Sequence, residues 1–202
     1  MIERPIPYSP QMVRARREGR KTQTRRLAKL PDCAEHVQYW APPSGRSQEG
    51  WADPGVNYWT DSGNHIDPCP YGQLGDRLWV REAYRTPVTY NHLPPRDIPH
   101  DAPIWYEADG PAPEHFAGGK YRHARFMPRR ITRGLDEITR IRVERLQDIS
   151  ETDALSEGVI VEGWPGAMCA KDAFHELWAT IHGPHAWDAN PWLWVIEFQV
   201  LA

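Results

Sequence analysis

The sequence predicts an α+β domain, a small barrel or strongly bent β-sheet with flanking helices and long loop insertions. Three observations indicate this fold class. Segments that alternate like strands outnumber those with helical periodicity, the expected strands are short, and the segments between them are long and rich in Pro and Gly. The chain has 202 residues, 40% of them hydrophobic and 25% charged, which is enough for one domain with its own core. We therefore expect a single domain over residues 1–202.

The first expected element is a helix over about residues 10–18. Ser9 is suited to the N-cap, Pro10 to the first helical position and Gly19 to the residue beyond the end. Most of the surface of this helix is expected to be basic and exposed, because its apolar face is thin and consists of Met12, Val13 and Ala15.

Two long insertions follow, at about residues 30–72 and 86–130. Both are rich in Pro, and the first also mixes Gly, Ser, Asp and aromatic residues without any sustained period. Long irregular segments within a domain are typically lids or binding loops. The first insertion could carry a short hairpin, and within the second we expect a short strand over 103–109.

Three segments alternate apolar and polar residues with a period of two, which predicts strands over residues 73–82, 135–146 and 192–201. The last alternates most strictly, so we expect it to be a central strand. Two further helices are expected. Ser150 to Asp153 forms a capping box that opens a helix ending at Gly158. Residues 170–182 place one apolar stripe toward the sheet, consisting of Ala170, Phe174, Leu177, Trp178 and Ile181.

Positive charge is concentrated in two segments of a chain whose net charge is only −3. Residues 1–30 hold nine Lys and Arg against two Glu, a net charge of +7, and residues 120–145 hold nine against three acidic residues, a net charge of +6. If the two segments fold next to one another, they form a positive face of the kind that binds nucleic acid or a nucleotide. The alternative is a pair of solvated faces that the acidic remainder of the chain neutralises.

Other signals bear on location and cofactors. The chain has no apolar run long enough for a membrane span, its N-terminus lacks the pattern of a signal peptide, and its three cysteines are too scattered for a disulfide framework. We expect a cytoplasmic protein that does not act at a membrane. No Gly-rich phosphate loop, nucleophile elbow or dinucleotide fingerprint is present, which disfavours nucleotide-triphosphate hydrolysis and hydride transfer, and no cofactor is expected.

Two Cys/His pairs and the tryptophans are further candidates for binding a ligand. Cys33-x-x-His36 and His65-x-x-x-Cys69 have spacings that a tetrahedral zinc could use, but neither is a paired-cysteine knuckle, so we expect ordinary thiols and imidazoles and no metal. The spacing of Trp178 along its helix is typical of core packing. Several other tryptophans lie in or beside loops and could stack on a base: Trp40, Trp51, Trp59 and Trp105.

Four segments in order resemble the landmarks of an ASCH domain: GRKTQTRR at 19–26, GDRLWVRE at 75–82, TRIRVERLQDISETDALSEG at 139–158 and WVIEF at 194–198. An ASCH domain is a small barrel of the PUA-like superfamily, and this chain is similar to the expanded forms of phage and prophage proteins. The landmarks cover about half of the chain, and the two insertions lie mostly outside them.

The resemblance is closest to the bacterial amidohydrolases that remove the acyl group from N4-acetylcytidine. It implies that Lys21, Thr24 and Glu157 are the candidate catalytic residues. In such a trio the Thr24 hydroxyl attacks an amide carbonyl, a neutral Lys21 or a water relay takes its proton, and Glu157 orients or protonates the leaving amine. Residues three apart in a regular strand point to opposite faces, so an irregular backbone is expected at 20–24.

The expected ligand is a nucleobase, a modified nucleoside or a nucleic acid, RNA rather than DNA. The expected cleft is walled by residues 19–26, 77–82 and Glu157, and its candidate binding residues are Arg20, Arg25, Arg26, Arg77, Trp79, Arg81 and Glu82.

Two alternatives remain open at this point. In the first, Lys21 and Arg25 bind phosphate while Thr24 caps a turn, and the protein is a non-catalytic RNA- or DNA-binding module. In the second, the protein is an RNA-cleaving enzyme that uses Lys21 and Glu157 on a ribose 2′-hydroxyl.

Overall fold

The computed structural model describes residues 1–29, 37–40, 57–60, 65–66 and 68–201. For the strand residues among 37–66 only the backbone is described.

The centre of the fold is a five-stranded sheet in the order β1-β6-β10-β11-β2. Its strands are β1 (Glu3–Pro7), β6 (Arg77–Arg81), β10 (Leu135–Arg145), β11 (Trp192–Val200) and β2 (Gln23–Leu27). β1 is parallel to β6, and the other neighbours are antiparallel. β11 has a partner on each side, as expected for a central strand.

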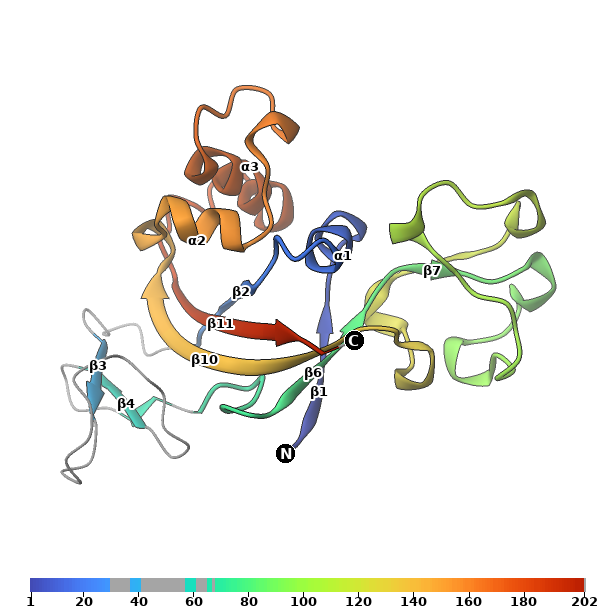
Figure 1. Ribbon diagram of the computed structural model, residues 1–202, viewed down its shortest axis with the longest axis horizontal. Helices are drawn as coiled ribbons and strands as arrows, with labels where there is room; N and C mark the ends of the chain where they lie inside the picture. The colour runs from blue at the N-terminus through green and yellow to red at the C-terminus, as the bar shows by residue number, and fades with distance from the viewer. Residues whose placement is uncertain (30–36, 41–56, 61–64, 67, 202) are drawn as a thin grey trace.

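The sheet is strongly bent but is not a closed barrel. β10 and β11 curve together along their whole length (Figure 1), and their pairing shifts register between Ile138 and Arg140. The edge strands β1 and β2 do not pair with each other among the described residues, so the sheet stays open. The expectation of a bent sheet is therefore confirmed, and that of a closed small barrel is not.

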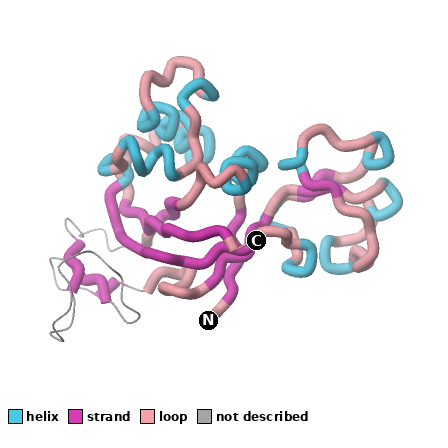
Figure 2. Tube along the Cα trace, in the orientation of Figure 1, coloured by secondary structure: helices cyan, strands magenta, loops and turns pink. Residues whose placement is uncertain are grey.

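Three helices lie on the same side of this sheet (Figures 1 and 2): α1 (Pro10–Arg17), α2 (Glu151–Ser156) and α3 (Ala170–His182). The two expected N-caps are present. Ser9 Oγ accepts a hydrogen bond from the Met12 backbone N–H at 3.3 Å, and Ser150 Oγ accepts one from Asp153 at 3.0 Å. Gly19 adopts a φ of +74°, which accounts for glycine just beyond α1.

Two details of the expected packing are wrong. Arg16 of α1 is buried, because its Nε donates to Asp136 Oδ1 at 2.6 Å, so the basic surface of this helix is not fully exposed. Ile181, placed by its spacing on the buried stripe of α3, is 61% exposed. The other stripe residues are in the core: Ala170, Phe174, Leu177 and Trp178.

The second insertion folds into a lobe of its own, at the right of Figure 2. Its three-stranded sheet has the order β8-β7-β9, with β7 (Tyr84–Arg85), β8 (Trp105–Tyr106) and β9 (Tyr121–Arg122). A separate cluster of buried residues forms its core: Tyr84, Ile98, Ala102 and Met127. The strand expected over 103–109 is confined to β8.

Short 3-10 helices connect many of these elements. Within or beside the lobe they are Val88–Tyr90, Pro95–Asp97, Glu107–Asp109, Glu114–Phe116, Ala124–Phe126 and Arg129–Ile131; the other two are Leu146–Asp148 and Val161–Gly163.

The first insertion contains a third sheet of antiparallel strands in the order β3-β4-β5. Its strands are β3 (Val37–Trp40), β4 (Asn57–Thr60) and β5 (His65–Ile66). In the described part of the chain, no helix has both the length and the apolar character needed to cross a membrane.

Candidate functional site

A pocket of about 520 Å³ opens between β2, α3 and the junction of β1 with α1. This volume falls within the ~300–1,000 Å³ typical of small-molecule sites. Lys21, Thr24 and Glu157 all line it. The structure therefore brings together the three residues that the sequence singled out.

The backbone around Lys21 explains how these side chains converge. Lys21 forms an isolated antiparallel bridge with Glu157, and its N–H donates to the carbonyl of Ala15 at 3.0 Å. Regular strand geometry begins only at Gln23. The chain is therefore irregular just before β2, as expected, although not as far along as Thr24.

The Lys21 side chain is 3% exposed, and its Nζ has three acceptors. It donates to Glu157 Oε2 at 2.9 Å, to the Glu157 carbonyl at 2.9 Å and to the Gln23 carbonyl at 2.8 Å. Burial lowers the pKa of Lys21 below its ordinary value, and the carboxylate of Glu157 opposes that shift. The ammonium is thus fully hydrogen-bonded, while its burial makes it easier to deprotonate than an exposed lysine.

Glu157 is the C-cap of α2, where a negative charge opposes the helix dipole. Two cations compensate for this placement. Lys21 contacts Oε2, and Arg25 Nη1 donates to Oε1 at 3.1 Å. Both oxygens of the buried carboxylate are therefore occupied by positive donors.

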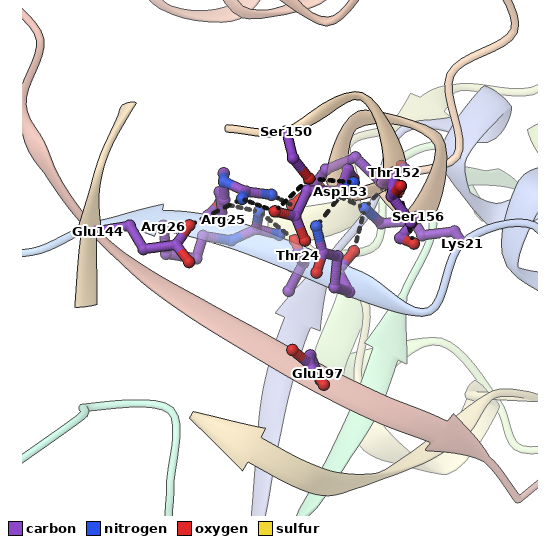
Figure 3. Close-up of polar contacts among 12 residues, drawn as sticks. Lys21, Thr24, Arg25, Arg26, Glu144, Ser150, Thr152, Asp153, Ser156 and Glu197 are labelled. Carbon is purple, nitrogen blue, oxygen red and sulfur yellow. Dashed lines mark hydrogen bonds and ion pairs between the residues drawn. The ribbon is translucent and has the colours of Figure 1, made fainter. Parts of the chain in front are cut away.

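Arg25 lines the pocket and is the centre of an ion-pair network, which Figure 3 shows with Glu144 and Asp153. Its Nη2 lies 3.0 Å from Glu144 Oε2 and 3.5 Å from Asp153 Oδ2. Arg142 extends the network to Glu144, Asp153 and Glu197. Arg25 is buried and contacts three carboxylates, so it holds β2 against α2 and β10, and its binding role stays a prediction.

Thr24 has a different neighbour. Its Oγ1 accepts a hydrogen bond from Arg26 Nη1 at 2.7 Å, and its hydroxyl donates to no group in the described part of the chain. Arg26 is partly exposed and lines the same pocket. A hydroxyl that keeps its proton and faces a cation is suited to act as a nucleophile, because the cation favours the charge that develops as the proton leaves.

Aromatic side chains make up much of the remaining wall. They come from the β1–α1 junction, from the segment before β6, from the lobe of the second insertion and from α3: Tyr8, Tyr71, Tyr121, His123, Phe174, Trp178 and His182. The rings of Trp178 and His182 lie 4.1 Å apart, centroid to centroid, at 30°. Burial, and after it the charge of Arg26, lowers the pKa of His182. Aromatic faces of this kind stack on nucleobases.

Most of this aromatic wall was not predicted from the sequence. The core packing expected for Trp178 is confirmed, because this residue is 3% exposed and belongs to the main core, and it lines the pocket as well. His182 lies four residues further along the same helix, and this i, i+4 spacing of two aromatic rings could have indicated that they share one face. Tyr8, just before the first helix, carried no pattern of its own.

The segment 77–82 does not wall the pocket, contrary to expectation. Neither Arg77, Trp79, Arg81 nor Glu82 is among the lining residues. In the sheet order β10 and β11 lie between β6 and β2, although Ala83, the residue directly after this segment, does line the pocket. Arg81 Cζ instead lies 4.6 Å from the Trp79 ring, and Glu82 Oε2 lies 2.8 Å from Arg133 Nη2.

Arg20 also lies outside the pocket lining. Its Nε donates to Glu18 Oε2 at 2.9 Å and its Nη1 donates to the Gly158 carbonyl at 2.9 Å. Its place in the structure is therefore a brace between the end of α1 and the residue after Glu157.

The two basic segments do lie next to one another, but carboxylates neutralise much of their charge. Arg16–Asp136 and Arg129–Glu3 join the two segments. Carboxylates from elsewhere in the chain form further pairs: Arg17–Asp109, Arg133–Glu82 and Arg133–Asp109. This surface therefore resembles the expected alternative, two faces neutralised by acidic residues, more than it resembles an open positive face.

The zinc candidates fall largely outside the described residues, which include neither Cys33 nor His36 nor the side chain of His65. Cys69 is a free, partly buried thiol whose pKa burial raises to about 11. Within the described ranges, no group of three or more His, Cys, Asp or Glu side chains could hold a metal ion.

In comparisons with protein-family models, with curated proteins and with solved structures, nothing matches this chain. The chemistry of the pocket therefore rests on its own residues and geometry.

Proposed function

We propose that this pocket binds a nucleobase or modified nucleoside and hydrolyses an N-acyl group from it, in the manner of an ASCH-type, PUA-like amidohydrolase. The observation that carries the proposal is the meeting of Lys21, Thr24 and Glu157 in one pocket with aromatic walls. The polar floor supplies a nucleophile and a proton carrier, and the aromatic wall supplies surfaces for a flat base.

The Lys21–Glu157 pair can exist in two protonation forms that differ by one proton shift along the 2.9 Å hydrogen bond. In the amine–carboxylic acid form, Lys21 is a base and Glu157 is an acid. Lys21 accepts the proton of Thr24 as Oγ1 attacks the acyl carbon, and Glu157 gives its proton to the leaving amine. The acyl group is then on Thr24, and the pair has become ammonium and carboxylate.

Hydrolysis of the acyl–threonine reverses these roles. Glu157 accepts a proton from the attacking water, and Lys21 gives its proton to Oγ1 as the C–O bond breaks. Thr24 and the amine–acid form of the pair are thereby restored. The burial that lowers the pKa of Lys21 favours the neutral amine that the first step requires.

A non-catalytic binding module is the second candidate, and one observation favours it. The three acceptors around Lys21 Nζ make the ion pair a well-satisfied structural link between β2 and α2. If this ion pair only stabilises the fold, Thr24 and the aromatic wall would bind a base, and no reaction would follow.

The test is release of acetate from N4-acetylcytidine by the wild type and by two variants. Lys21→Ala and Thr24→Val are each expected to lose at least ~100-fold in rate. Thr22→Val is the matched control, because Thr22 is an exposed threonine of the same segment that does not line the pocket.

The other outcomes separate the remaining candidates. RNA binding that weakens steeply with salt, without acetate release, supports the binding module. Shortened RNA that persists in Thr24→Val but not in Lys21→Ala supports the nuclease, because a ribose 2′-hydroxyl supplies its own nucleophile.

A further inference from the structure

Arg26 gives the pocket an excess positive charge. The other pocket cations, Lys21 and Arg25, are paired with carboxylates. Arg26 pairs with no carboxylate in the described part of the chain. Its hydrogen bonds go to the Thr24 hydroxyl at 2.7 Å, the Arg25 carbonyl at 2.8 Å and the Pro7 carbonyl at 3.0 Å.

These three bonds do not exhaust its donors. A guanidinium carries five N–H groups. Two of the bonds use Nη1 and one uses Nη2, so Nε–H and a second Nη2–H have no acceptor among the described residues. A guanidinium with free N–H groups is suited to bind an anionic oxygen, and its charge makes such hydrogen bonds about twice as strong as neutral ones.

The neighbours of Arg26 indicate which group of the ligand would carry this anionic oxygen. Nη1 donates to Thr24 Oγ1, the atom that we propose as the nucleophile. The remaining donors belong to the same guanidinium and are therefore close to that oxygen. The Arg26 side chain also lies over the Tyr8 ring, with Cζ 5.8 Å from its centroid. The guanidinium is thus held in place beside the nucleophile before any ligand arrives.

We propose that Arg26 is a further catalytic residue that stabilises the oxyanion formed when Thr24 attacks the acyl carbonyl. This inference rests on the proposed function and assigns the group that receives the charge of that step. Attack by Oγ1 turns the carbonyl oxygen into an oxyanion, and collapse of the intermediate returns its electron pair to the C=O bond as the amine leaves. Arg26 keeps all its protons throughout and contributes hydrogen bonds and charge alone.

The same argument disfavours the other use of a free arginine, which is to hold a phosphate of the substrate. In an acylated cytidine the acyl group and the ribose phosphate are at opposite ends of the molecule. A cation bonded to the nucleophile is therefore placed for the acyl end.

The experiment compares kcat and KM for N4-acetylcytidine in the wild type, Arg26→Gln, Arg26→Lys and the control Lys29→Gln. Lys29 is an exposed cation three residues further along that does not line the pocket. Arg26→Gln is expected to lower kcat about 100-fold or more, as for other lost oxyanion donors, with KM within a few-fold of the wild type. Arg26→Lys is expected to recover part of kcat, because it keeps the charge but not the forked donors.

A binding measurement separates oxyanion stabilisation from mere positioning of Thr24. The probe is a cytidine in which an anionic methylphosphonyl group replaces the acetyl group and mimics the tetrahedral intermediate. Arg26→Gln should weaken its binding by a factor similar to the loss in kcat, and should leave binding of cytidine unchanged.

Three results would overturn the inference. They are a kcat for Arg26→Gln within a few-fold of the wild type, an equal loss of affinity for the probe and for cytidine, or a loss of rate seen with N4-acetylcytidine 5′-phosphate, assayed in parallel, but not with N4-acetylcytidine. Each of these leaves wild-type hydrolysis intact. A wild-type protein that releases no acetate overturns the proposed function as well, so the two failures are distinguishable.

Discussion

Two of the buried ion pairs are Lys21–Glu157 at the pocket and Arg16–Asp136 in the core. The second pair is less completely satisfied. Asp136 Oδ1 accepts from Arg16 Nε at 2.6 Å, but Oδ2 is buried without a partner. Burial raises the pKa of Asp136 to about 6, although the charge of Arg16 opposes the shift. The folded protein therefore holds this proton more tightly than the unfolded chain does.

This shift predicts how stability depends on pH. The contribution of Asp136 is fully present below the ordinary carboxyl pKa of about 4 and is lost as the pH rises through about 6. Asp136→Asn cannot titrate, so the unfolding free energy of the wild type minus that of the variant should be larger near pH 4 than near pH 7, by on the order of 3 kcal/mol. Denaturant titrations at the two pH values measure this. Asp101→Asn, at an exposed aspartate, controls for the general change in charge, and a difference that grows with pH would contradict the account.

At the scale of elements, the site depends on how the end of α2 meets the start of β2. The bridge between Lys21 and Glu157 joins them, and Gly158 follows directly with a φ of +89°. A Cβ at Gly158 would lie 2.8 Å from the Ala15 Cβ and 2.9 Å from the Lys21 Cβ. Glycine is therefore required here twice, by the backbone conformation and by the close approach of α1 and Lys21.

Gly158→Ala tests this contact against a matched glycine. Gly166 also has a positive φ, +95°, but a Cβ there meets nothing within 4 Å. Both substitutions carry the same kind of backbone strain, so their difference reports the packing against Lys21. We expect Gly158→Ala to lose about 1–3 kcal/mol more unfolding free energy than Gly166→Ala and to lower the rate of acetate release, because Lys21 must shift. Equal losses in the two variants would show that the close approach is unimportant.

At the scale of the whole molecule, the pocket lies where the main sheet meets the lobe of the second insertion. β2 and α3 supply the floor and one part of the wall, and Tyr121, His123 and Ala124 of the lobe supply another. The lobe has its own small core, so it can present these residues as a unit. We therefore expect the lobe to contribute to substrate affinity and not to the chemical step.

Two aromatic residues of the lobe allow a controlled test. Tyr121 lines the pocket and is 47% exposed, whereas Phe126 is 58% exposed and lies outside it. Each ring has an arginine over it, Arg85 at 5.7 Å and Arg125 at 5.9 Å. Tyr121→Ala should raise KM about tenfold through lost stacking while leaving kcat nearly unchanged, and Phe126→Ala should change neither. Steady-state kinetics measures both variants. Equal effects of the two substitutions on KM would contradict a role of the lobe in substrate binding.

Local patterns predicted the local structure well. The caps at Ser9 and Ser150 are both present, and the helix expected over 170–182 and the last strand are placed within about one residue. Such local patterns do not predict the order of the strands in the sheet, because that order depends on contacts between distant segments. Residues 77–82, expected to wall the same cleft as residues 19–26, do not line the pocket for this reason.

The candidate site was predictable only in part, for a related reason. The resemblance of residues 19–26 to an ASCH landmark is what implied Lys21 and Thr24. Whether a cation is free or paired depends on the carboxylates around it, so Arg25 and Arg26 look alike in sequence although one is buried among three carboxylates and the other has none among the described residues. The aromatic wall was missed because its members come from several distant segments.

The most direct test of the acyl-transfer chemistry is to trap the acyl group on the protein. Glu157→Gln removes the group that activates water but leaves Thr24 and Lys21. With p-nitrophenyl acetate, whose leaving group needs no proton, this variant should accumulate one acetyl group that peptide mapping locates on Thr24, and Glu157→Gln with Thr24→Val should not. Acetylation that is absent, or that is the same with Val at position 24, would contradict the assignment of Thr24 as the nucleophile.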